Sequence, residues 1–118
     1  ALFEGAPDRA ERVRRLALGF FRLFDRLKAF GHVQLEQDML PVLRPFVEEE
    51  RRMREMLAQA AVGEGDPDRA ATLAALLDHG VYYGLRVQGF SADEAALRIA
   101  EVANAWLAAP RPGDDPND

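Results

Sequence analysis

The chain has 118 residues, a formal net charge of −5 and no cysteine. This length fits one domain, and the lack of cysteine excludes disulfides and thiolate metal sites. The acidic balance argues against nucleic-acid binding by these residues, because a phosphate backbone requires clustered Lys and Arg. No apolar stretch predicts a membrane span and no leader predicts secretion, so we expect a cytoplasmic protein without a membrane contact.

The first part of the chain is expected to be helical. Apolar residues recur every three or four positions over residues 8–30, with arginines largely between them, and Gly31 follows. This pattern predicts an amphipathic helix that ends at the glycine. A short second helix is predicted over residues 32–40, because Pro41 disfavours helical backbone in the residue before it.

A third helix is predicted over residues 45–61, where apolar side chains again recur at helical spacing. Two pairs of opposite charge, Glu48 with Arg52 and Glu50 with Arg54, are each four residues apart. Such pairs lie on one side of a helix and stabilise it by about 0.3–0.5 kcal/mol each. We therefore interpret the charged run as a solvated face.

A glycine-rich break precedes the next predicted helix, which covers residues 67–88. Asp66 is expected to cap its amino end, with Pro67 in the first turn, and Gly89 to close its carboxyl end. Little polar surface is left in the second half of this segment. More than one of its faces must therefore be covered.

The last helix is predicted to begin after Ser91, which forms a capping box with Glu94 three residues later. Proline, glycine, aspartate and asparagine dominate residues 110–118, which we expect to be a disordered tail. No strand-like alternation occurs. The sequence therefore predicts an all-α fold of about five helices, with one domain over residues 1–109.

The last two predicted helices carry more apolar surface than one small bundle can hide. We expect them to pair with a second copy in an intersubunit four-helix bundle, because two-fold pairing is the commonest form of oligomer. Burial of both faces within one chain is the alternative. The Ile99, Val102 and Trp106 stripe is predicted to face the chain's own core. The predicted dimer interface consists of small and apolar residues: Gly80, Gly84, Val87, Ala96, Ala100, Ala103 and Leu107.

Three stretches resemble the regulatory half of TetR-family transcriptional regulators. Residues 66–85 and 89–95 are similar to the dimerisation helices of that family, and residues 6–16 look like the start of its regulatory core. The resemblance implies a homodimer that binds a small effector and controls transcription. It also implies that DNA binding would reside in an N-terminal helix-turn-helix, which these residues do not contain.

The implied effector is small and apolar, and bulky side chains at helical spacing are the candidates to line its pocket. Asp78 and His79 are the candidate orienting polar groups. Aromatic and methionine side chains in such a pattern more often fill a core than contact a ligand. The apolar pocket candidates are Phe20, Phe24, Met39, Phe46, Met53, Met56, Tyr82, Tyr83 and Trp106.

No arrangement in the sequence predicts catalysis, a metal or a cofactor. His32 and Glu36 have a spacing compatible with two metal ligands, but no further ligand accompanies them. Ser91 is the only serine and is already assigned to a helix cap. Two functions remain: the dimerising, effector-binding half of a TetR-like regulator, or a helical protein-interaction module without a small-molecule site.

Overall fold

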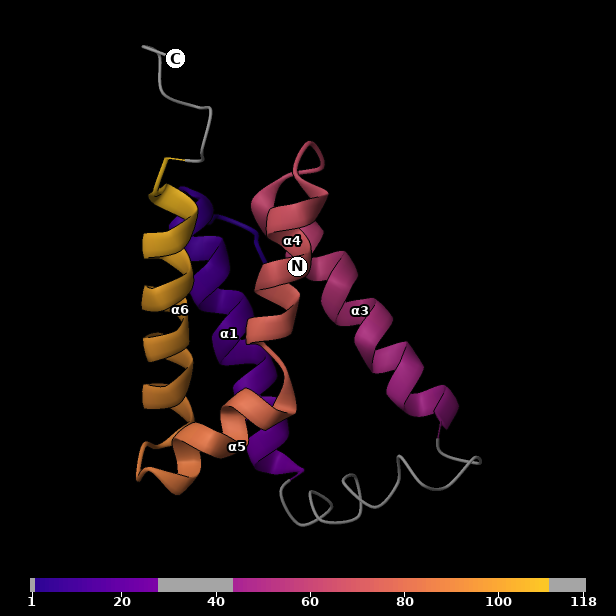
Figure 1. The fold of residues 1–118 in the computed structure, drawn as a ribbon, viewed down its shortest axis with the longest axis vertical. Coiled ribbons are helices and arrows are strands. Elements are labelled where there is room, and N and C mark those ends of the chain that lie inside the picture. The colour runs from indigo at the N-terminus through magenta and orange to yellow at the C-terminus, as the bar shows by residue number, and fades with distance from the viewer. Residues whose placement is uncertain (1, 28–43, 111–118) are drawn as a thin grey trace.

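The computed structural model describes residues 2–27 and 44–110. Within these ranges the chain forms helices and no strand, so the all-α class is confirmed (Figure 1). The predicted helix over residues 32–40 and most of the tail over 110–118 lie outside the described residues. The helices are α1 (Arg9–Arg26), α3 (Arg44–Val62), α4 (Pro67–Leu76), α5 (His79–Val87) and α6 (Ala92–Ala108).

Helix α1 is the centre of the bundle, and it packs against α6, α3 and α5. In Figure 1, α6 lies along one side of α1, while α3 diverges on the other side. The apolar stripe predicted from the sequence is the buried face of α1. Burial of each valine, leucine or phenylalanine side chain on this face contributes about 1.5–3 kcal/mol to folding. The buried residues of α1 are Val13, Leu16, Ala17, Phe20, Phe21 and Phe24.

The predicted helix starts are confirmed where polar side chains cap them. Asp66 accepts a hydrogen bond from the backbone of Arg69 at the start of α4. Ser91 and Glu94 form the reciprocal capping box at the start of α6, with both hydrogen bonds at 3.1 Å. These caps satisfy backbone N–H groups that have no partner inside the helix.

The prediction of a single helix over residues 67–88 is wrong. The chain leaves the helix after Leu76 and starts α5 at His79, so that α5 crosses the end of the bundle (Figure 1). Asp78 causes the break. Its backbone is extended, with φ −68° and ψ 151°, and its carboxylate accepts from the N–H of Gly80 at 2.9 Å. A short polar side chain competes in this way with the helical hydrogen bonds of its own segment.

Arginine side chains hold the carboxyl end of α6 against the rest of the bundle. Arg9 of α1 and Arg69 of α4 both donate to the carbonyl oxygen of Leu107, at 3.1 and 3.0 Å. Positive charge at this end complements the helix dipole and satisfies a carbonyl that the helix leaves open. At the other end, Arg22 binds both carboxylate oxygens of Asp93 at 2.9 Å. The position of α6 on α1 is thus fixed at both ends.

Candidate functional site

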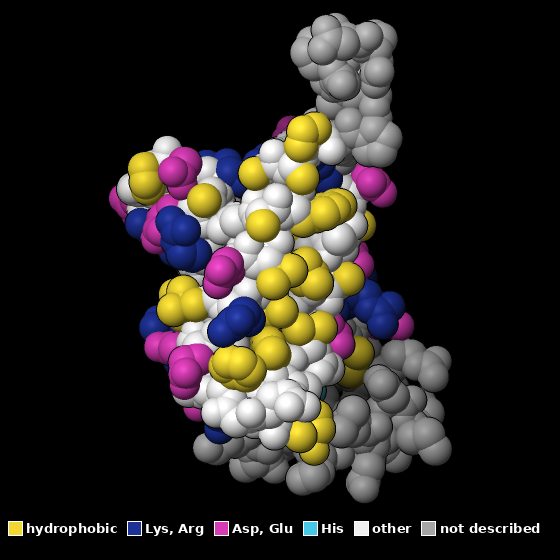
Figure 2. Space-filling view, turned by 60° about the vertical axis from the view of Figure 1, so that its left-hand side comes forward, with side chains coloured by type: hydrophobic (Ala, Val, Ile, Leu, Met, Phe, Trp, Pro, Cys, Tyr) yellow, Lys and Arg dark blue, Asp and Glu magenta, His cyan; other side chains and the backbone are white. Residues whose placement is uncertain are grey.

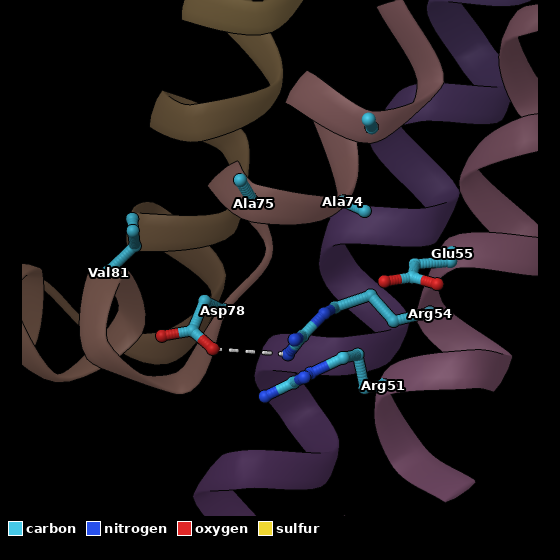
Figure 3. Close-up of a pocket in the computed structure, with 8 residues that line it drawn as sticks. Arg51, Arg54, Glu55, Ala74, Ala75, Asp78 and Val81 are labelled. Atoms are coloured by element: carbon cyan, nitrogen blue, oxygen red, sulfur yellow. Dashed lines mark ion pairs between the residues drawn. The ribbon is translucent and has the colours of Figure 1, made fainter. Parts of the chain in front are cut away.

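A cleft of about 510 Å³ opens between α3, α4 and the start of α5 (Figure 3). This volume lies in the range of pockets that hold small molecules in proteins. One wall carries charged side chains from α3, and the facing wall carries alanines from α4. The lining residues are Arg51, Arg54, Glu55, Ala71, Ala74, Ala75, Asp78 and Val81.

Arg54 is the most deeply placed charged side chain of this cleft, with only 8% of its surface exposed. Its Nη1 donates to Glu50 at 3.1 Å and lies 3.4 Å from a carboxylate oxygen of Asp78. Its Nε is buried and has no hydrogen-bond partner among the described residues. A buried donor left in this state costs about 1–3 kcal/mol. Among the described residues, the carboxylates of Glu50 and Asp78 therefore stabilise the guanidinium at Nη1, while its Nε has no acceptor.

Asp78 connects the cleft to α5. One carboxylate oxygen pairs with Arg54 of α3, and the other accepts from the backbone of Gly80. The same side chain therefore caps α5 and ties its first turn to α3. Any group that competed for Arg54 in the cleft would also act on the start of α5.

Burial changes the acidity of Glu50 beside the cleft. Desolvation raises the pKa of its carboxyl group above the ordinary value of 4.5, and the charge of Asp78 acts in the same direction. The guanidinium of Arg54 opposes this change but does not cancel it. Burial thus destabilises the ionised form of Glu50, although its carboxylate accepts a hydrogen bond from Arg54.

Aromatic side chains of α1 and α5 pack together on the inner side of α5. His79 meets the ring of Phe24 edge-on at 5.2 Å between centroids, and lies 5.6 Å from Tyr82. Tyr82 donates its hydroxyl proton to Asp25 of α1 at 3.1 Å. Desolvation in this cluster lowers the pKa of His79, although the nearby charge of Asp78 acts in the opposite direction. The cluster anchors α5 to α1 and encloses a titratable ring.

Of the predicted pocket residues, the structure brings only Asp78 to the cleft. Phe20, Phe24 and Tyr82 are buried in the core, and His79 packs beside the last two. Met39 and the side chain of Phe46 lie outside the described residues. The remaining candidates are on the surface, away from the lining of the cleft: Met53, Met56, Tyr83 and Trp106.

The interpretation of the charged run on α3 as a solvated face needs correction. The predicted Glu50–Arg54 pair forms, but Arg54 is buried beneath α4 and α5 rather than solvated. Arg51 and Glu55 line the same cleft. Sequence reasoning missed these residues, because charged positions three and four apart are typical of an exposed helix side. The available signal was the alanine-rich segment of α4, which leaves room for long side chains opposite it.

A second feature is the exposed apolar surface of α5 and α6. Val87 is 64% exposed, and Val102 and Trp106 are 50% and 44% exposed. Tyr83 and Gly84 lie on the same outward side of α5 as Val87, three or four residues apart. Figure 2 shows hydrophobic side chains gathered in a band along α6. We call Tyr83, Gly84, Val87, Val102 and Trp106 the outer face. Apolar surface of this kind is typical of interaction sites.

The predicted orientation of α6 is reversed in the structure. Ala96, Ala100, Ala103 and Leu107, expected at a dimer interface, are buried in this chain's own core. Small side chains allow α6 to lie close to α1, so the flat face is used within the chain. Of the stripe expected to face the core, Ile99 does so, while Val102 and Trp106 turn outward. On α5, the predicted interface residues Gly80, Gly84 and Val87 are exposed.

Comparisons with protein-family models, with curated proteins and with solved structures yield no match for this chain. Within the described residues, none of the helices combines the length and apolar character needed to cross a bilayer. The same residues contain no group of three or more His, Cys, Asp or Glu side chains placed to hold a metal ion. His32 and Glu36, whose spacing suggested metal ligands, lie outside the described residues. The cleft and the outer face are thus the features from which a function can be argued.

Proposed function

We propose that this chain forms a symmetric homodimer through the outer face and binds a small molecule in the cleft, as the regulatory half of a TetR-like regulator. DNA binding in such a regulator would reside in a separate helix-turn-helix segment. The observation that carries the proposal is the exposure of Tyr83, Val87, Val102 and Trp106 on two consecutive helices.

A second copy of the chain is the best occupant of this surface. The outer face combines two large aromatic side chains with two valines, and aromatic residues are enriched at protein interfaces. Because α5 crosses the end of the bundle, the pairing would rest mainly on α6 of each subunit, with α5 contributing at one end. A two-fold axis would bring the same apolar residues of both copies together, so one surface would serve both partners.

Asp78 supports a sensing role, because it links the cleft to the outer face. It pairs with Arg54 in the cleft and caps α5, the helix that carries Tyr83 and Val87. A ligand can shift an equilibrium only through different affinities for two arrangements. A ligand in the cleft that altered the Arg54–Asp78 ion pair would therefore also affect the hydrogen bond by which Asp78 caps α5. Dimerisation and ligand binding would then influence each other reciprocally.

Sedimentation equilibrium of matched charge variants tests the dimer. Val102→Glu places a carboxylate in the centre of the proposed interface, and we expect it to weaken dimerisation at least about tenfold, because an unpaired charge would be desolvated. Met56→Glu is the control. Met56 is 62% exposed, but it lies on α3, on the other side of α1 from α6. A wild type that stays monomeric at high concentration, or equal effects of the two variants, would contradict the proposal.

The exposed methionines of α3 favour the alternative function of a helical interaction module. Met53 and Met56 are both about half exposed or more, and flexible methionines are common on surfaces that bind several proteins. This alternative predicts a cleft that binds no small molecule, and a partner protein whose binding is lost on Met56→Glu and unaffected by Val102→Glu. The same pair of variants therefore separates the two functions.

A further inference from the structure

Two arginines on one side of α3 point into the cleft. Arg51 and Arg54 are three residues apart, so their side chains leave the helix in similar directions. In Figure 3 both extend from α3 toward Asp78 at the start of α5. Arg51 is exposed and forms no ion pair within 4 Å with any residue that the structure describes. The cleft therefore carries an exposed guanidinium without an ion pair to any described residue, next to a second one that is buried.

The buried guanidinium lacks an acceptor for one of its donors. Glu50 and Asp78 both approach Nη1 of Arg54, whereas Nε has no hydrogen-bond partner among the described residues. Asp78 cannot easily serve both donors, because its second oxygen accepts from Gly80. This buried donor is closed to a ligand, but the exposed guanidinium of Arg51 lies beside it, and a planar carboxylate matches the donor geometry of such a group.

The opposite wall of the cleft suits an apolar group. Ala71, Ala74 and Ala75 of α4 present methyl groups across from the arginines, and Val81 of α5 lies at one end. A ligand with a hydrocarbon or aromatic body could cover these side chains while its polar end reaches α3. Pockets that combine an apolar wall with a few polar groups commonly hold small organic molecules.

We infer that the cleft binds a small monocarboxylate, with its carboxylate on the exposed Arg51, beside the Arg54–Asp78 pair, and its apolar body against α4. This inference rests on the proposed ligand-binding role of the same cleft and names the class of ligand. A cationic ligand would be repelled by Arg51, whereas the charge of Arg54 is already offset by Glu50 and Asp78. A second negative charge on the ligand would meet Glu55, which lines the cleft, and Glu50 behind Arg54.

An NMR titration with three isosteric probes tests the ligand class. Phenylacetate, phenylacetamide and phenethylammonium share a phenyl group and differ in charge. We expect phenylacetate to shift backbone amide signals of α3 and α4 and to saturate in the millimolar range, with a Kd of about 1 mM or below. The amide and the cation should bind at least about tenfold more weakly, because the amide carries no charge and the ammonium group has no acceptor, so neither can form an ion pair with Arg51.

Variants on α3 separate the cleft from general charge effects. Arg51→Gln should weaken phenylacetate binding about tenfold, because it removes one ionic hydrogen-bond donor. Arg52→Gln is the matched control. Arg52 is an exposed neighbour that pairs with Glu49 and does not line the cleft, so its loss should leave the affinity unchanged. Because Arg51 is exposed, its substitution tests the site without the risk of unfolding that accompanies changes at Arg54.

Three results would overturn the inference, and each leaves the dimer to the separate sedimentation test. Equal affinities for phenylacetate and phenylacetamide would retain a ligand-binding cleft but exclude carboxylate recognition. Equal losses in Arg51→Gln and Arg52→Gln would show that only net charge matters. Absence of any signal change with all three probes, at concentrations up to about 10 mM, would exclude the site.

Discussion

Two helices of this molecule present alanines to a neighbouring helix, with opposite results. Ala96, Ala100 and Ala103 of α6 are almost completely buried in the core that α6 shares with α1. Ala71 and Ala75 of α4, by contrast, are exposed and line the cleft in front of α3. The same residue type thus forms a closed helix contact in one place and the wall of a cavity in the other.

The side chains of the partner helix explain this difference. Helix α1 meets the alanines of α6 with leucine and phenylalanine, which fill the space at the density of a protein interior. Around the cleft, by contrast, α3 faces α4 with arginine and glutamate, whose charged ends must keep access to water or to opposite charges, although Ala58 and Ala61 of α3 are buried. Small residues permit a close approach, but the opposite surface decides whether it occurs.

The largest expected effect is the loss of a large side chain from the closed core. Phe21 is fully buried on α1 and contacts the ring of Tyr82 at 5.5 Å between centroids. Phe21→Ala should lower the free energy of unfolding by about 3–5 kcal/mol, because it removes apolar contacts and leaves a cavity. Urea denaturation measures this change. As a control, Met56→Ala on the exposed side of α3 should change it by only about 0.5 kcal/mol.

The same substitution at the two alanine surfaces tests the comparison directly. Ala100→Leu inserts a larger side chain between α6 and α1, and should cost about 1–3 kcal/mol of stability. Ala75→Leu extends into the cleft, so we expect stability to change little and phenylacetate binding to weaken. Urea denaturation and the NMR titration provide the two readouts. Equal destabilisation by both variants would mean that the cleft is closed in solution.

The aromatic cluster beneath α5 should make stability depend on pH. His79 has a folded-state pKa below its ordinary value of 6.5, so the unfolded chain binds protons more readily as the pH falls through this range. Its contribution to stability is complete above pH 6.5 and is lost at lower pH. His79→Phe keeps a ring beside Phe24 but cannot titrate. The variant should therefore lose less stability than wild type between about pH 7 and pH 5. Parallel denaturation curves would contradict this expectation.

The smallest expected effect concerns the charged wall of the cleft. Because the folded-state pKa of Glu50 is raised, its contribution to stability is present below its ordinary pKa of 4.5 and is lost as the pH rises through the folded value. Glu50→Gln should therefore be slightly more stable than wild type at neutral pH, and this gain should disappear in acid. Glu49→Gln changes an exposed carboxylate of the same helix and should show no such gain. A loss of stability in Glu50→Gln at neutral pH would mean that its ion pair outweighs its burial.

Much of the helical content could be predicted because it depends on local interactions. The stripe of α1, the Asp66 cap and the Ser91–Glu94 capping box each involve residues within a few positions of one another. The break at Asp78 is also a local feature, but it was missed because the surrounding apolar pattern continues through it. The cleft could not be predicted, since its charged and apolar walls come from different helices.

The helical class, most helix boundaries and an excess of apolar surface over what one helix contact requires were all predictable from the sequence. Periodicity and capping are sufficient for these features, because they depend on spacing along the chain. Only the tertiary structure decided that the alanine face of α6 turns inward, that Val102 and Trp106 turn outward and that Arg54 is buried. These outcomes depend on which side chains another helix brings opposite each face, and the spacing along one helix carries no information about its partner.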